Sequence, residues 1–203
     1  MELHAVTGGT MPVEELAEVI PHVAQYTDYI HIREKNKPSQ EVAILIEQML
    51  ANGVNKEKLV INDRLDLALL FGIPNVHLPG SGLPVKKIKQ RFPQIRAGVS
   101  VHSLAEAKKA EKDGADYCFF GHIFATDSKK RLAPRGTAAL GEITRHVNIP
   151  VIAIGGITPD NMHLVLEKGV AGIAVMSRIF SAADPKQASW RFRKELENYI
   201  KGE

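Results

Sequence analysis

The sequence predicts an α/β fold: one domain over residues 1–203, folded as a (β/α)8 TIM barrel. Short apolar segments alternate with longer amphipathic segments along the whole chain, which is the pattern of strands alternating with helices. There are eight apolar segments, rich in Val and Ile as buried parallel strands are. No glycine-rich fingerprint follows the first segment, which disfavours the alternative, a doubly wound open sheet.

The predicted strands, in chain order, are 3–7, 29–34, 58–63, 75–79, 95–101, 117–121, 150–156 and 172–177. The predicted helices are 12–26, 38–53, 64–72, 84–92, 104–114, 136–147, 159–169 and 184–200. A short helix is also expected to begin near Ser177. The chain is shorter than the usual barrel of about 250 residues, so its loops must be short.

Local signals support these helix boundaries. Ser103 and Glu106 have the spacing of a capping box. Thr158 and Asp184 each precede a proline, which suits the first position of a helix. Glycines follow three of the helices, where a left-handed residue is favoured: Gly53, Gly114 and Gly169.

Composition excludes several classes of protein. The net charge is only +3, and no clustered basic stripe appears before the last helix, so we expect no nucleic-acid partner. No apolar run approaches the roughly 20 residues of a membrane helix, so we expect no membrane partner. The single cysteine, Cys118, cannot form an internal disulfide and is read as an inert core thiol. The first residues lack a secretion signal, and we expect a cytoplasmic protein.

Unusual polar residues gather at the carboxyl ends of the predicted strands, where TIM barrels place their chemistry. Glycines 155 and 156 would let backbone N–H groups approach a ligand, and Met176 and Ser177 end the next strand. Phosphate commonly binds between the loops after strands seven and eight of such barrels, so we predict a phosphate site here. The alternative is a tight turn with Ser177 acting only as a cap.

A second group follows strands two and three. Arg33 and Lys35 suit an anion, although Arg33 and Glu34 could instead form a surface ion pair. Asn62 and Asp63 could likewise do no more than cap the following helix.

Of the eight histidines, His122 is the strongest candidate for chemistry, because it ends strand six at the predicted rim. An ordinary pKa near 6.5 would let it both give and take a proton at neutral pH. His31 and His77 lie inside strands and are read as satisfied core residues. Lys129 and Lys130 are read as part of a solvated loop.

Six ordered segments resemble the signature segments of the thiamine phosphate synthase superfamily. They are HIREK, INDRLDLAL, GVSVHSLAEA, GADYCFFGHIFATDSKK, IPVIAIGGITPDN and GIAVMSRIF, and they span nearly the whole chain. The resemblance also implies the barrel fold, and it suggests a homodimer.

The chain departs from the synthase pattern at three places. The synthase has QLREK where this chain has HIREK, and GPIFPT where this chain has GHIFAT, so His122 replaces a proline. The synthase holds magnesium and pyrophosphate with two aspartates. One corresponds to Asp63, whereas the segment after strand four reads HLPGSG and carries no carboxylate in place of GQxD.

These departures resemble the thiazole tautomerase group of the superfamily, which implies an isomerase that needs no metal and no cofactor. Its substrate would be a phosphorylated thiazole carboxylate, which becomes aromatic when a proton leaves the ring and another arrives at the exocyclic carbon. His122 would transfer both protons. Arg33, helped by Lys35 or Asn62, would hold the carboxylate, and Ser100 would line the pocket. The backbone of Gly155, Gly156, Met176 and Ser177 would hold the phosphate.

Two other functions stay open at this stage. One is a magnesium-dependent thiamine phosphate synthase, which joins a pyrimidine pyrophosphate to a thiazole phosphate. The other is a non-catalytic protein that binds a thiamine precursor and regulates other proteins. The fold cannot choose among these functions, because the barrel hosts many chemistries.

Overall fold

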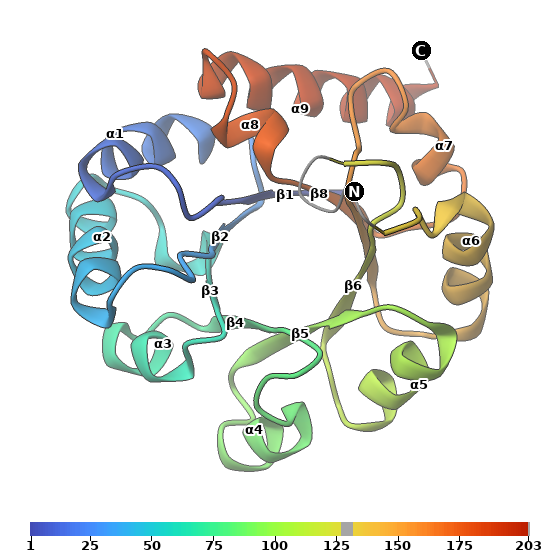
Figure 1. Cartoon of the computed structure of the whole chain (residues 1–203), viewed down its shortest axis with the longest axis horizontal. Helices are drawn as coiled ribbons and strands as arrows, with labels where there is room; N and C mark the ends of the chain where they lie inside the picture. The colour runs from blue at the N-terminus through green and yellow to red at the C-terminus, as the bar shows by residue number, and fades with distance from the viewer. Residues whose placement is uncertain (127–131, 203) are drawn as a thin grey trace.

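The computed structural model describes residues 1–126 and 132–202. Its eight strands form one closed parallel barrel in the order of the sequence, surrounded by a ring of helices (Figure 1). β1 pairs with both β2 and β8, and the pairing of Leu3 with Ile173 closes the sheet. The predicted TIM barrel is confirmed.

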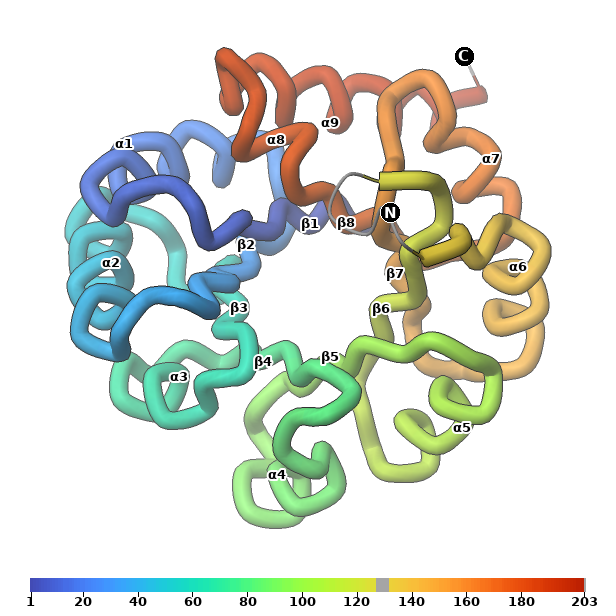
Figure 2. Tube along the Cα trace, in the orientation of Figure 1, coloured from blue at the N-terminus to red at the C-terminus, as the bar shows by residue number. Residues whose placement is uncertain are grey.

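The strands are β1 (Glu2–Val6), β2 (Tyr29–Ile32), β3 (Leu59–Asn62), β4 (Asn75–Leu78), β5 (Arg96–Val101), β6 (Tyr117–Gly121), β7 (Val151–Ile154) and β8 (Gly172–Val175). The helices are α1 (Val13–Val23), α2 (Ser39–Ala51), α3 (Leu65–Phe71), α4 (Val85–Arg91), α5 (Leu104–Lys112), α6 (Gly136–His146), α7 (His163–Leu166), α8 (Ser177–Phe180) and α9 (Pro185–Lys201), with a 3-10 turn η1 (Lys56–Lys58). Each strand is followed by a helix as the chain circles the barrel (Figure 2).

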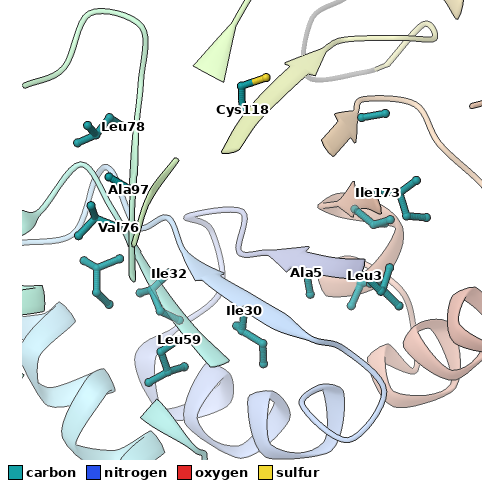
Figure 3. Close-up of a cluster of buried hydrophobic side chains, with 14 of the residues drawn as sticks. Leu3, Ala5, Ile30, Ile32, Leu59, Val76, Leu78, Ala97, Cys118 and Ile173 are labelled. Atoms are coloured by element: carbon teal, nitrogen blue, oxygen red, sulfur yellow. The ribbon is translucent and has the colours of Figure 1, made fainter. Parts of the chain in front are cut away.

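The period-two alternation of each strand separates two layers of side chains. Outward-facing residues such as Leu3, Ala5 and Ile30 pack among the helices in the main apolar core (Figure 3). Inward-facing residues meet near the barrel axis, where Tyr117 and Phe119 pack with apolar neighbours. The barrel interior is unusually polar, because it also contains three buried histidines: His4, His31 and His77.

The helix signals were right at two of three sites. The hydroxyl of Ser103 accepts a hydrogen bond from Glu106 N–H, and the carboxylate of Asp184 accepts one from Gln187 N–H. The prediction at Thr158 was wrong, because α7 begins only at His163. The Asn161 side chain holds the preceding segment in a turn: its Oδ1 accepts from Thr158 N–H and its Nδ2 donates to Gly156 O.

The predicted left-handed glycines are confirmed, with φ of 80° at Gly53, 86° at Gly114 and 75° at Gly169. No helix of the described residues is both long and apolar enough to cross a membrane.

Candidate active site

A cavity of about 1540 Å³ opens at the carboxyl-terminal end of the barrel. All nine predicted site residues line it: His122, Arg33, Lys35, Asn62, Ser100, Gly155, Gly156, Met176 and Ser177. They come from strands or loops as far apart as β2 and β8, yet they converge because parallel strands end at one face of the barrel.

The side of the cavity after β2 and β3, which we call the charged side, carries three charged side chains and one amide: Arg33, Lys35, Asp63 and Asn62. The backbone of Arg33 is fixed by its N–H, which donates to the hydroxyl of Thr7 at 2.8 Å. Glu34 is buried and pairs with Lys37, at 2.6 Å, rather than with Arg33. Within the described residues, no ion pair engages Arg33 or Lys35, so both cations are available to an anion.

Asp63 adopts a left-handed conformation, with φ of 58°, which aspartate tolerates better than most residues. An ideal Cβ built on Gly82, in the loop after β4, would lie 3.0 Å from Asp63 Oδ1. This is the segment in which the synthase pattern carries its second aspartate. The structure therefore brings Gly82 of this segment directly beside Asp63, a proximity that sequence alone does not show.

The residues of this side fit a magnesium ion that would share its ligands with substrate phosphates. No group of three or more His, Cys, Asp or Glu side chains in the described chain could enclose a metal. Magnesium, however, is often bound by one or two carboxylates together with substrate phosphates. Asp63 supplies one such carboxylate at the edge of the cavity.

The opposite side, which we call the glycine side, is made of Gly155, Gly156, Met176 and Ser177. Both glycines have positive φ, 103° and 69°. A Cβ at Gly155 would lie 2.4 Å from His122 Cβ, and a Cβ at Gly156 would lie 2.6 Å from Ala125 O. These glycines therefore leave room for the loop after β6, and they also line the cavity.

His122 follows β6 and is only 4% exposed. The peptide bond before it is cis. Its Nε2 lies 3.3 Å from Leu132 O, and its own carbonyl oxygen accepts from Arg135 N–H at 3.0 Å. Its side chain forms part of the cavity wall, directly beside Gly155 of the glycine side. Lys129 and Lys130, which were read as part of a solvated loop, lie outside the described residues.

Below the cavity, the buried histidines use their ring nitrogens in hydrogen bonds. His77 Nε2 lies 2.8 Å from Ser100 Oγ, so Ser100 lines the cavity with its hydroxyl already engaged. His31 Nδ1 lies 3.1 Å from the Asn62 amide, and His4 Nδ1 lies 2.9 Å from His31 Nε2. The core role predicted for His31 and His77 is confirmed by their burial and hydrogen bonding.

Burial removes water from these imidazoles and lowers their pKa values. The pKa of His77 falls to about 3, and that of His31 falls well below 6.5, with the nearby His4 and His77 adding to the effect. The rings are therefore neutral at pH 7. Burial also raises the pKa of the Cys118 thiol to about 12, which agrees with an inert core cysteine.

Sequence reasoning did not select several further polar residues that line the cavity: Lys37, Arg64, Ser81, Glu106 and Arg178. Arg178 lies in the single helical turn α8, directly after the predicted Ser177. Only its position in the VMSRIF segment, next to Ser177, could have suggested that Arg178 lines the cavity. The residue pattern alone does not show which way this side chain faces.

The description "thiamine monophosphate synthase" belongs to the family model that matches residues 3–179. Thiamine-phosphate synthase from Anaeromyxobacter dehalogenans is 36% identical over 197 residues, covering 96% of this chain and 87% of the relative. That of Pyrococcus furiosus is 37% identical over 172 residues, covering 84% and 83%. The solved thiamine phosphate pyrophosphorylase of Pyrococcus furiosus superposes with a TM-score of 0.82 at 34% identity, covering 98% and 96%.

These relatives correct the prediction of an isomerase. The two sequence relatives are named thiamine-phosphate synthases, which are transferases, the solved structure is named a thiamine phosphate pyrophosphorylase, and none of the three is named a tautomerase. The prediction failed because it gave the replacement at His122 more weight than the agreement of the rest of the chain. The similarity extends over nearly the full length of the barrel, and the chain belongs to the thiamine monophosphate synthase family.

Proposed function

We propose that this chain is a transferase of thiamine phosphate synthesis, which joins a pyrimidine pyrophosphate to a thiazole phosphate. The observation that carries the proposal is the arrangement of the cavity, with cationic side chains on one side and glycine backbone on the other. The two substrates bring a diphosphate and a monophosphate, so a site for both must accept anions at two places.

The diphosphate is assigned to the charged side. Arg33 can make paired hydrogen bonds to phosphate oxygens, and Lys35 adds a mobile positive charge. Asp63 would hold magnesium, which would offset the charge of the diphosphate as it departs. The thiazole phosphate is assigned to the glycine side, where the backbone of Gly156 and Ser177 borders the cavity.

The reaction requires a bond from the thiazole to the pyrimidine, while the bond to the diphosphate breaks and the diphosphate leaves with the electron pair. No proton needs to move at the ring in this step. His122 therefore contributes to binding and shape in this proposal rather than to proton transfer. The main task of the protein is to hold two anionic substrates in contact and to stabilise the leaving diphosphate.

The test is a coupling assay with purified protein, pyrimidine pyrophosphate, thiazole phosphate and Mg²⁺, in which thiamine phosphate is measured. Product formation that EDTA abolishes is expected. Arg33→Ala should lower kcat/KM by about 100-fold, the order of losing a charge-assisted hydrogen bond to the reacting group. Arg145→Ala, a change in α6 and outside the cavity lining, is the matched control and should leave kcat/KM unchanged.

Failure to form thiamine phosphate at any Mg²⁺ concentration would refute the transferase. The same would follow if the protein instead accelerated the aromatisation of a thiazole tautomer in the presence of EDTA. Equal activity of the wild type and the Arg33→Ala variant would remove Arg33 from the diphosphate site.

A further inference from the structure

A continuous row of hydrogen bonds crosses the barrel interior from its amino-terminal end to the cavity. Glu2 Oε2 lies 2.9 Å from His4 Nε2. His4 Nδ1 lies 2.9 Å from His31 Nε2, and His31 Nδ1 lies 3.1 Å from the Asn62 amide. Both rings are fully buried, whereas Glu2 is partly exposed and Asn62 lines the cavity. We call these four residues the relay.

The direction of these hydrogen bonds follows from counting protons. A carboxylate only accepts, so His4 Nε2 must carry a hydrogen and donate it to Glu2. A neutral imidazole has one N–H, so His4 Nδ1 is bare and accepts from His31 Nε2–H. His31 Nδ1 is then bare as well, and the Asn62 amide must donate to it. In this neutral state Asn62 turns its NH2 toward His31 and its carbonyl oxygen away from it.

One additional proton on His4 reverses the direction of the hydrogen bonds between His4, His31 and Asn62. If His4 carries a hydrogen on both nitrogens, its Nδ1 donates to His31 Nε2, and His31 must then hold its own hydrogen on Nδ1. The Asn62 group facing His31 then has to be the carbonyl oxygen. A half-turn about the last side-chain bond exchanges the two ends of the amide. The NH2 of Asn62 then points toward the cavity, where it can donate a hydrogen bond to a ligand.

We propose that Glu2, His4 and His31 are positioning residues, and that proton uptake at His4 turns the Asn62 amide from a hydrogen-bond acceptor into a donor toward an anionic ligand. The relay is thus a specificity device, and its link to diphosphate rests on the function proposed above. Binding of an anion beside Asn62 and binding of a proton at His4 would favour each other, because both select the same order of hydrogen bonds.

The surroundings of His4 make the neutral state the resting one. Burial lowers the pKa of His4, and this effect exceeds the opposing influence of the Glu2 carboxylate. Burial raises the pKa of Glu2, but the hydrogen bond from His4 and the charge of Arg96 outweigh this effect and lower the pKa below its usual value, so Glu2 stays ionised. An anion at Asn62 therefore has to supply the free energy that protonates His4.

Groups from several elements face His4. The Tyr29 ring stacks on it at 4.9 Å, and Phe119 meets it edge-on at 5.4 Å. The charged and titratable groups around it are Glu2 on β1, Asp28 before β2, Tyr29 and His31 on β2, His77 on β4, Arg96 on β5 and Tyr117 on β6. Among the carboxylates in this set, Glu2 alone hydrogen-bonds His4, at 2.9 Å, so it is the partner for an added proton.

Nitrogen-15 NMR of the wild-type imidazoles tests the relay in the ligand-free protein. At pH 8, His4 and His31 should both be Nε2–H tautomers. On acidification, protonation of His4 and the shift of His31 to its Nδ1–H tautomer should share one midpoint. A His31 tautomer that stays the same while His4 becomes protonated would overturn the proposal, and so would an Nδ1–H tautomer of His31 at pH 8.

Calorimetry with inorganic pyrophosphate, repeated in buffers of different ionisation enthalpy, tests the coupling to ligand. Wild type should take up about one proton more per bound pyrophosphate than Glu2→Gln, because the uncharged amide of that variant cannot stabilise a protonated His4. Glu57→Gln, an exposed change in η1 at the same end of the barrel, is the control and should behave as wild type. Equal uptake in Glu2→Gln and wild type would overturn the coupling.

The two proposals fail in distinguishable ways. If pyrophosphate does not bind, the diphosphate site of the proposed function is wrong, and the acid titration of the free protein still decides the relay. If pyrophosphate binds with no difference in proton uptake and no change of the His31 tautomer, the relay is wrong and the diphosphate site stands.

Discussion

The two sides of the cavity are built in different ways. The charged side presents side chains, such as Arg33 and Asp63, whose charge can be removed by a replacement that suits the local backbone, as Asn suits position 63. The glycine side presents backbone, and its two glycines are also the places where the loop after β6 fits against β7. A substitution on the charged side can therefore weaken ligand binding while leaving the free energy of unfolding unchanged, whereas a substitution on the glycine side alters both.

The largest effect is expected from Gly156→Ala. The new methyl group would lie 2.6 Å from Ala125 O at a φ of 69°, so crowding and backbone strain act together. We expect the free energy of unfolding to fall by about 2–4 kcal/mol, and we expect most of the activity to be lost. Chemical denaturation measures the change.

Gly53→Ala is the control for this prediction. It also has a positive φ, 80°, but no atom lies within 4 Å of the added Cβ. Backbone strain alone should lower the free energy of unfolding of this variant by about 1 kcal/mol. Equal losses for the two variants would mean that the glycine side is not crowded and that the contrast between the two sides is wrong.

Asp63→Asn should lower activity with little change in the free energy of unfolding. Asparagine tolerates the left-handed conformation of this position, so stability should change little. Loss of the magnesium carboxylate should reduce Mg²⁺-dependent coupling by about 100-fold, as expected for a lost ligand. Asp160→Asn, an exposed change outside the cavity lining, is the matched control for activity. Activity that survives in Asp63→Asn would place magnesium elsewhere.

Gly82→Asp should strengthen the charged side. Its Cβ would lie 3.0 Å from Asp63 Oδ1, so a second carboxylate could share the same ion. The Mg²⁺ concentration for half-maximal coupling should fall by about tenfold, provided that Pro79, 2.9 Å from the new Cβ, can move aside. Gly82→Asn has the same shape without the charge and should show no gain. A gain in both variants would point to loop shape rather than to charge.

The smallest effect is expected from His122→Asn. Because coupling moves no proton at the ring, kcat should change only a few-fold, whereas KM for the thiazole phosphate should rise as the cavity wall changes. Steady-state kinetics separates the two. A loss of kcat by about 1000-fold would show that His122 transfers a proton and would contradict the transferase step.

The fold was predictable because each strand is a short apolar segment between helical patterns, and one such rule locates all eight strands. The convergence of the predicted site residues on one cavity was predictable for the same reason, since the ends of parallel strands meet. Asn161 shows the limit, because its hydrogen bonds to Thr158 and Gly156 replace helix with turn and leave no periodic signal. The proximity of Gly82 to Asp63 and the contact of His4 with His31 were equally hidden, because they join segments distant in the chain.

The polar interior of the barrel makes the protein sensitive to acid. His77 is neutral in the folded state because burial lowers its pKa to about 3, whereas the unfolded chain would bind a proton near pH 6.5. This contribution to the free energy of unfolding is fully present above pH 6.5. Below pH 6.5 it falls by about 1.4 kcal/mol per pH unit for each such histidine, until the pH reaches the pKa of the folded state. Urea unfolding from pH 8 to pH 5 should show this loss. His77→Gln should reduce it, while the exposed His22→Gln should not. A barrel lined with aliphatic side chains would lack this contribution, so the residues that give this interior its hydrogen bonds also raise the pH at which the protein unfolds in acid.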